Sequence, residues 1–150
     1  LSIFIANKIK LNELILVAAS PCLVNTEQWS FGIRKEVFDQ FAINLKKDST
    51  KALKRFVSLQ SKNKSQIQEL HKSIQKYSAS QSALNNGLEI IINSDLRAIY
   101  KNISTPKTCI LGDLDTLIPE KIQHWYAEAG AEIHVLNSGH LPFLDKSFKI

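Results

Sequence analysis

The apolar positions of this chain form three short continuous runs and four longer stretches at helical spacing. The continuous runs cover residues 14–18, 109–111 and, with one histidine inside it, 133–136. Short apolar runs that contain β-branched residues are typical of strands buried on both faces of a parallel sheet. We therefore expect three parallel strands in an α/β arrangement.

Four amphipathic stretches separate the first run from the second. In residues 37–45, 53–60, 67–77 and 83–92, apolar side chains recur every three or four positions among polar ones. This period indicates helices with one buried face. Four successive helices between two core strands form an insertion. The chain thus divides into a core helix end and strand (1–22), a helical insertion (23–105), and core strands with their loops (106–150).

Polar loops follow the second and third predicted strands, which a helix from Pro119 to about Ala129 connects. Asp113 and Asp115 come directly after the second strand, and His140 lies in a loop rich in Ser, Gly and Pro after the third. Because the carboxyl ends of adjacent parallel strands meet at one edge, we expect Asp115 and His140 to lie close together. The simpler alternative for each residue alone is a helix cap or an ordinary loop position.

A carboxylate beside an imidazole indicates nucleophilic catalysis. A neutral imidazole takes the proton of a serine hydroxyl and returns it to the leaving group. The carboxylate on the other ring nitrogen fixes the tautomer and stabilises the cation that forms. Such a pair needs loops at strand ends, because side chains inside a strand point into the faces of the sheet.

Length and composition exclude several classes of protein. The 150 residues are enough for one domain with a core of its own, and no apolar run approaches the roughly 18 residues of a membrane span. Cys22 and Cys109 lack the spacing of a metal or redox motif, and His124 and His134 have no cluster of ligands around them. We expect no metal and two buried free thiols, as in a cytoplasmic protein.

The net charge of +5 is concentrated in the helical insertion. Residues 46–76 hold nine basic and two acidic side chains, a local balance of +7. Such a segment attracts an acidic partner by long-range electrostatics. The alternative is a solvated helix surface without a partner. Nucleic acid fits poorly, because aromatic residues do not alternate with these lysines and no docking motif is present.

The two loops carry motifs that resemble those of α/β-hydrolases. These motifs are Gly112, Asp113, Leu114, Asp115 and Pro119, then Gly139, His140, Leu141, Pro142 and Phe143. The resemblance implies an α/β-hydrolase fold with the chain order nucleophile, acid, histidine. It implies Asp115, rather than Asp113, as the triad acid and His140 as the general base. In this comparison the chain is the C-terminal half of the parallel sheet with an inserted four-helix lid, and the N-terminal half is absent.

Motifs in the insertion resemble a particular family of esterases. They are Ala19 to Cys22 with Trp29, then Arg55 to Gln60, Asn86 to Ile90 and Asp95 to Arg97. In order and spacing they are similar to the pimeloyl-[acyl-carrier protein] methyl ester esterases of biotin synthesis. The resemblance implies a serine carboxylesterase that cleaves the methyl ester of pimeloyl on acyl-carrier protein. It implies a cytoplasmic enzyme without a cofactor, bound to neither membrane nor nucleic acid, and a monomer when complete.

The resemblance also assigns roles to individual residues. An acyl channel would be lined by Phe56, Val57, Ser58, Leu59, Gln60 and His140. Basic positions that meet the carrier protein would be Lys51, Arg55 and Lys72. Gln68 stands where a further basic residue is expected, so the carrier contact would be weaker or shifted to Lys62 and Lys64. Apart from the resemblance, we expect Phe143 to anchor the histidine loop in the core, and Trp29 either to pack in the core or to flank the pocket entrance.

Two parts of an acyl-transfer site are missing from this sequence. No G-x-S-x-G motif occurs in it, and no oxyanion hole can be assigned. We expect the nucleophile to be encoded a few residues upstream of Leu1, in keeping with a sequence that contains no Met. Taken alone, the chain is expected to be inactive and to fold poorly, because half of its sheet would be uncovered.

Two alternatives to the carrier-dependent esterase remain open. The chain could belong to a short-acyl esterase or another lid-bearing hydrolase, which activity on a small ester without a carrier would favour. It could also be a non-catalytic remnant whose basic helices bind an acidic partner, which carrier binding without hydrolysis would support.

Overall fold

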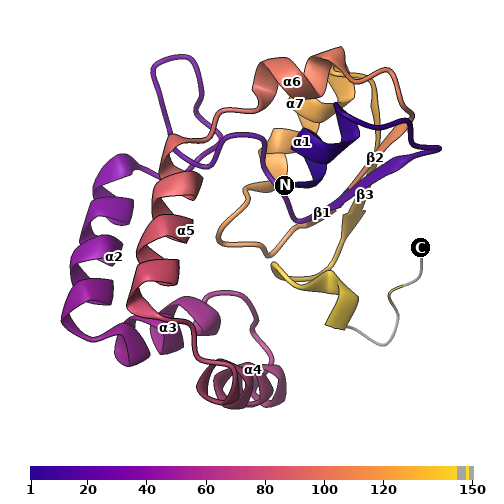
Figure 1. Ribbon diagram of the computed structural model, residues 1–150. Coiled ribbons are helices and arrows are strands. Elements are labelled where there is room, and N and C mark those ends of the chain that lie inside the picture. The colour runs from indigo at the N-terminus through magenta and orange to yellow at the C-terminus, as the bar shows by residue number, and fades with distance from the viewer. Residues whose placement is uncertain (145–147, 149–150) are drawn as a thin grey trace.

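Three parallel strands form the sheet of this protein, whose computed structural model describes residues 1–144 and 148. They are β1 (Leu14–Val17), β2 (Lys107–Gly112) and β3 (Ala131–Leu136), with β2 in the centre (Figure 1). All three predicted strands are confirmed. The strand β1 ends before Ala18, because that residue adopts a left-handed conformation with φ of 45°.

Three short helices share one buried core with the sheet. They are α1 (Ser2–Ala6), α6 (Arg97–Asn102) and α7 (Gln123–Glu128). The core includes Leu16 and Leu111 from the sheet and the fully buried Tyr100 and Tyr126 from α6 and α7. The predicted helix between β2 and β3 is shorter than expected. It begins as the 3-10 turn η1 (Glu120–Ile122) and ends at Glu128.

The opposite face of the sheet is hollowed. A shallow groove of about 340 Å³ is lined by Glu13, Ile15, Thr108, Ile110, Glu132, His134 and Leu136. On α1, Phe4 is 50% exposed. In the groove, Ile110 is buried and Ile15 and Leu136 are partly buried. The expectation that the sheet is incompletely covered stays a prediction. The next core helix, which the sequence predicts to begin around 145–148, falls mostly on residues that are not described.

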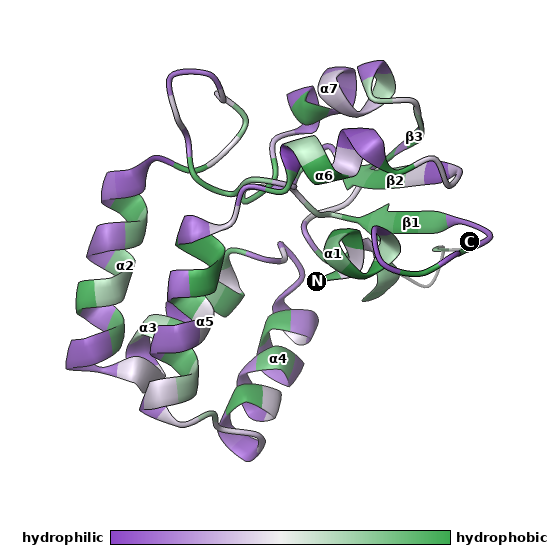
Figure 2. Ribbon diagram, turned by 45° about the horizontal axis from the view of Figure 1, so that its top comes forward, coloured by the Kyte–Doolittle hydropathy of each residue, from purple (hydrophilic) through white to green (hydrophobic). Residues whose placement is uncertain are grey.

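The four predicted helices of the insertion are all present. They are α2 (Lys35–Lys47), α3 (Ser49–Ser58), α4 (Lys64–Lys76) and α5 (Gln81–Asn93), and together they form a helical layer beside the sheet (Figure 1). Side chains of Asp48, Asn63 and Ser80 cap α3, α4 and α5 by accepting backbone N–H groups. Apolar and polar residues alternate around these helices, whereas β1 is apolar throughout (Figure 2).

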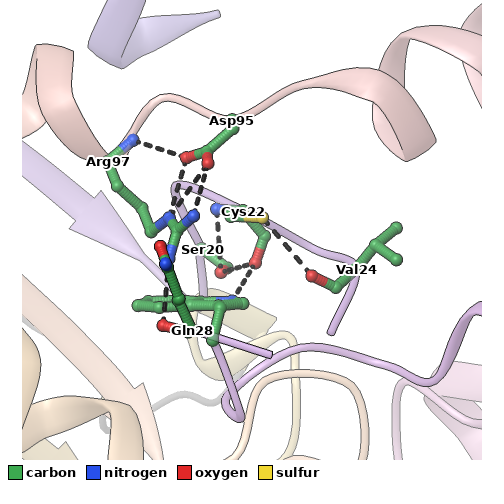
Figure 3. Close-up of polar contacts among 7 residues, drawn as sticks. Ser20, Cys22, Val24, Gln28, Asp95 and Arg97 are labelled. Atoms are coloured by element: carbon green, nitrogen blue, oxygen red, sulfur yellow. Dashed lines mark hydrogen bonds and ion pairs between the residues drawn. The ribbon is translucent and has the colours of Figure 1, made fainter. Parts of the chain in front are cut away.

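The two ends of the insertion are joined by a cluster around Arg97 (Figure 3). Arg97 forms an ion pair with Asp95 at 2.6 Å, donates to the carbonyl of Gln28 and lies over the ring of Trp29. Trp29 is only 2% exposed and donates from Nε1 to the carbonyl of Cys22. Trp29 therefore packs in the core, which is one of the two predicted alternatives. The division into segments 1–22, 23–105 and 106–150 stays a prediction.

No helix in the part of the chain that the structure describes combines the length and the apolar character of a membrane span.

Candidate active site

The loops after β2 and β3 are packed backbone against backbone. The amide of Asp113 donates to the carbonyl of Leu136, and the amide of Leu114 donates to that of Ser138, both over 3.0 Å. A Cβ atom on Gly112 would overlap the carbonyl oxygens of Ser138 and Gly139. Glycine at position 112 therefore allows the close approach that brings the acid loop and the histidine loop together.

Asp115 and His140 form a hydrogen-bonded pair at this edge of the sheet. Oδ2 of Asp115 lies 2.9 Å from Nδ1 of His140. The other carboxylate oxygen accepts the backbone N–H groups of Leu117 at 2.7 Å and Ile118 at 3.1 Å. The side chain of Asp115 is 1% exposed, whereas that of His140 is 21% exposed. The carboxylate is thus buried and fixed, and the imidazole reaches the surface.

This arrangement leaves the second imidazole nitrogen available for chemistry. A carboxylate can only accept, so Nδ1 of His140 carries the hydrogen and Nε2 is unprotonated in the neutral ring. Within residues 1–144 and 148, Nε2 has no hydrogen-bond partner. An imidazole held in this tautomer can take a proton from a hydroxyl placed at Nε2.

Asp113, the competing acid, is used differently. Its side chain is exposed and accepts a hydrogen bond from Nδ2 of Asn137 at 3.1 Å. It therefore ties the two loops together at the surface. The expected proximity of Asp115 and His140 is present, and Asp115 is the carboxylate that contacts the imidazole.

A groove of about 650 Å³ lies between α2 and α3. The aromatic rings of Phe41 and Phe56 lie in it with centroids 5.6 Å apart, and Val37, Ala52 and Leu59 add apolar surface. Its polar lining consists of Arg34, Glu36, Gln40, Asn44, Lys47, Asp48, Lys51 and Arg55. The groove thus combines apolar side chains with polar ones, six of which are charged.

The five predicted acyl-channel residues at the end of α3 and directly after it have different surroundings. Phe56 and Leu59 line the groove, whereas Val57 is 5% exposed and packs inside the helical layer. The hydroxyl of Ser58 donates to the carbonyl of Lys54 and lies 3.3 Å from Nε2 of His71 on α4. The groove therefore receives two of the five side chains. Gln60 acts through its backbone carbonyl, which accepts the amide of His140 at 3.1 Å.

The predicted carrier-binding residues lie on two helices. Lys51 and Arg55 of α3 line the groove, and both are exposed. Lys72 is exposed on α4 and is not among the groove residues. The aromatic anchor predicted for the histidine loop was wrong, because Phe143 is 53% exposed and the neighbouring Pro142 is buried instead.

Sequence reasoning missed the α2 side of the groove. Arg34, Phe41 and Lys47 belong to it, although only the apolar stripe of α2 had been noted. The spacing of Phe41 and Phe56 on consecutive helices gives no signal that their rings meet. Sequence reasoning also missed the hydroxyl of Thr116, which donates to the carbonyl of Leu59 over 2.9 Å.

The two thiols are buried away from this site. Cys109 is 1% exposed, and burial raises its pKa to about 11. Burial is also the main cause that raises the pKa of Cys22. Both cysteines are free. Among the residues that the structure describes, no group of three or more His, Cys, Asp or Glu side chains is arranged to hold a metal ion.

Solved structures with the same fold define the class of this protein. A hydrolase from Oleispira antarctica matches 96% of this chain with a TM-score of 0.84 at 16% identity. An alpha/beta hydrolase enzyme from a deep-sea metagenome matches 95% of it with a TM-score of 0.66 at 17% identity. This chain covers 57% and 55% of those two proteins, respectively. No family profile matches the chain. The chain thus has the fold of these hydrolases.

The curated relatives of this chain share one name. A pimeloyl-[acyl-carrier protein] methyl ester esterase of Wigglesworthia glossinidia brevipalpis is 31% identical over 93% of this chain. The enzyme of the same name from Aliivibrio fischeri (strain MJ11) is 34% identical over 90% of it. The chain spans 57% and 55% of these two relatives, so it corresponds to about half of their length. Its homologues are thus pimeloyl-[acyl-carrier protein] methyl ester esterases.

Proposed function

We propose that this chain supplies the acid, the base and the lid of a serine carboxylesterase that hydrolyses the methyl ester of pimeloyl-[acyl-carrier protein] in biotin synthesis. The observation that carries the proposal is the buried carboxylate of Asp115, 2.9 Å from Nδ1 of an imidazole whose other nitrogen has no hydrogen-bond partner among the described residues. The names of the relatives, at about 30% identity over most of the chain, support the substrate.

In this proposal His140 is the general base and then the general acid. Its Nε2 takes the proton of a serine hydroxyl as the oxygen attacks the ester carbonyl, and returns it to the departing methoxide. Asp115 holds the ring and stabilises the imidazolium. The two N–H groups of Leu117 and Ile118 keep the carboxylate from rotating away, so the pair is preorganised before the substrate binds.

The helical layer would act as the lid that binds the acyl chain. Phe41, Phe56 and Leu59 give the α2–α3 groove an apolar floor that suits a chain of methylene groups. Leu59, which lines the groove, also accepts the hydroxyl of Thr116, the residue after the proposed triad acid. His140 is not among the residues that line the groove, so the proposal places only the acyl chain there.

Cations around the same groove favour a carrier that is acidic. Lys51 and Arg55 line the groove, and Lys72 adds a positive charge on the next helix. Acyl-carrier proteins are strongly acidic, so a segment with a balance of +7 would steer them toward the helical layer. The groove itself holds four basic and two acidic side chains, so its own net charge is +2.

The serine would come from a segment outside these 150 residues, since they contain no G-x-S-x-G motif. The coding DNA upstream of the Leu1 codon tests this directly. We expect an in-frame G-x-S-x-G a few codons before Leu1, and a stop codon or frame break there would overturn the catalytic claim. The uninterrupted protein is then assayed for methanol release from the methyl ester of pimeloyl-[acyl-carrier protein].

Two histidine variants sharpen this assay. His140→Gln is expected to lower the rate by about three orders of magnitude or more. His124→Gln changes an exposed histidine on α7 and is expected to leave the rate unchanged. Equal rates for both variants would exclude His140 as the base. Hydrolysis of a short methyl ester as fast as the carrier-bound one would favour a general short-acyl esterase.

A further inference from the structure

The end of α3 is bound to both catalytic loops through consecutive carbonyl groups. The carbonyl of Leu59 accepts the hydroxyl of Thr116 at 2.9 Å, one residue beyond Asp115. The carbonyl of Gln60 accepts the backbone amide of His140 at 3.1 Å. The last carbonyls of a helix have no partner within the helix. Here the two loops of the active site provide these partners.

The contact with the histidine loop is also tight. A Cβ atom on Gly139 would lie 3.0 Å from the carbonyl oxygen of Gln60, which is closer than an unstrained contact allows. Glycine at position 139 therefore lets the backbone of the loop lie against the end of α3. His140 is the next residue, so a displacement of this end of α3 moves the base directly.

We infer that Leu59, Gln60, Thr116 and His140 form a latch that fixes the helical layer to the catalytic pair, with Thr116 as a positioning residue. The hydroxyl of Thr116 holds the end of α3 on the acid loop, and the carbonyl of Gln60 then fixes the histidine relative to Asp115. The catalytic meaning of the latch rests on the proposed function. Its existence rests on the contacts alone.

Because of the latch, a change in the position of α3 also changes the position of His140 relative to Asp115. Lys51 and Arg55 lie on the same helix, one to two turns before Leu59. A partner that binds at those cations would shift or stabilise α3, and the two carbonyls would transmit this to His140. A free flap would lack such a connection, since its motion would leave the amide of His140 unaffected.

Amide exchange and imidazole resonances of the uninterrupted protein test the latch without any substrate. In Thr116→Val, which keeps the shape but removes the hydroxyl, the amide of His140 should exchange about three to ten times faster. The Nδ1–H resonance of His140 should broaden as the ring becomes less fixed against Asp115. Thr116→Ser restores the hydroxyl and should return both signals to the wild-type values.

Thr50→Val is the matched control. Thr50 is exposed at the other end of α3, so its substitution should leave both His140 signals unchanged. Thermal unfolding of every variant separates a local effect from general destabilisation. The latch is overturned if Thr116→Val exchanges like the wild type, if Thr116→Ser fails to restore protection, or if the wild-type amide exchanges like an unfolded peptide.

The outcome is independent of the proposed function. A protected His140 amide in a protein that hydrolyses no ester would sustain the latch and contradict the esterase. An active esterase whose His140 amide is indifferent to Thr116→Val would do the opposite.

Discussion

Nδ1 of His140 lies 2.9 Å from Oδ2 of Asp115, and the carboxylate is oriented by two backbone N–H groups on its other oxygen. Asp115→Asn should therefore disturb the tautomer of His140 while keeping the shape of the loop. In the uninterrupted esterase we expect the rate to fall by about 10⁴-fold. In the 150-residue chain, the Nδ1–H resonance of His140 should disappear.

Asp113→Asn is the control for this substitution. Asp113 is exposed and accepts only from Asn137 among the described residues, so the resonance of His140 and the rate should both stay near their wild-type values. A larger effect of Asp113→Asn than of Asp115→Asn would indicate that Asp113, and not Asp115, is the acid that orients His140.

Gly112→Ala should separate the two catalytic loops. The new methyl group would meet two backbone carbonyls, of Ser138 and Gly139, which cannot move aside as a flexible side chain can. We expect a loss of stability of at least about 1 to 3 kcal/mol, measured by urea unfolding. The resonances of His140 should shift with it.

Gly87→Ala provides a contrasting change at a second glycine. A Cβ atom there meets nothing within 4 Å, and the residue lies inside α5. Alanine should stabilise the protein by up to about 1 kcal/mol through helix propensity. Destabilisation by Gly87→Ala equal to that of Gly112→Ala would refute the steric argument for the loops.

The sequence was sufficient for the elements and for the proximity of Asp115 and His140. Continuous apolar runs and helical spacing located the strands and the four helices of the insertion, and strand polarity brought Asp115 to His140. It was insufficient for contacts between segments far apart in the chain. The bond from Thr116 to Leu59 spans 57 residues and involves a backbone carbonyl, which has no signature in the sequence.

Surface exposure of single aromatic residues was equally hard to predict. Phe143 and Trp29 both lie in loops, yet Phe143 is 53% exposed and Trp29 is 2% exposed. The difference arises because Trp29 finds a hydrogen-bond partner in Cys22 and a ring partner in Trp125, 5.3 Å away. No local pattern in the sequence indicates that Trp29 contacts Cys22 or Trp125.

Arg97→Lys should weaken the junction between the two ends of the insertion. The guanidinium of Arg97 binds both carboxylate oxygens of Asp95 and also reaches the carbonyl of Gln28, which a single ammonium group cannot reproduce. We expect a lower midpoint of thermal unfolding. Lys35→Arg, at an exposed ion pair within α2, is the control and should have little effect. A smaller loss at position 97 than at 35 would contradict the role of this junction.

The same ion pair predicts that stability depends on pH in the acid range. The hydrogen bond from Arg97 lowers the pKa of Asp95 below its ordinary value of 3.8. The folded state then binds fewer protons than the unfolded state, so this stabilisation is present above pH 3.8 and is lost as the pH falls through the lower, folded pKa. In Asp95→Asn, urea unfolding should show a smaller loss of stability below pH 4 than in the wild type. If Asp95→Asn loses as much stability below pH 4 as the wild type, Asp95 is not the cause of that loss.

Cys109 should make the protein less stable at alkaline pH. Burial raises its pKa from 9.0 to about 11, so between these values the unfolded chain has lost the thiol proton that the folded chain keeps. Stability should therefore fall as pH rises through this window, by about 2 to 3 kcal/mol in total from this group. Cys109→Ala should flatten that part of the profile. A thiol reagent at pH 8 should label Cys109 only on unfolding, and rapid labelling of the folded chain would contradict its burial.

Binding of an acidic carrier should depend on where the positive charge lies. Lys51→Glu and Arg55→Glu alter cations that line the α2–α3 groove, whereas Lys10→Glu makes the same change of net charge in the exposed segment between α1 and β1. We expect the groove variants to weaken binding of holo acyl-carrier protein by about three- to tenfold each at low salt, measured by calorimetry. Raising the salt to about 1 M shortens the screening length to about 3 Å and should abolish the difference. If Lys10→Glu weakens binding equally, only the net charge matters and the groove is not the docking site. If only the groove variants weaken it, the carrier binds on the helix whose end holds His140.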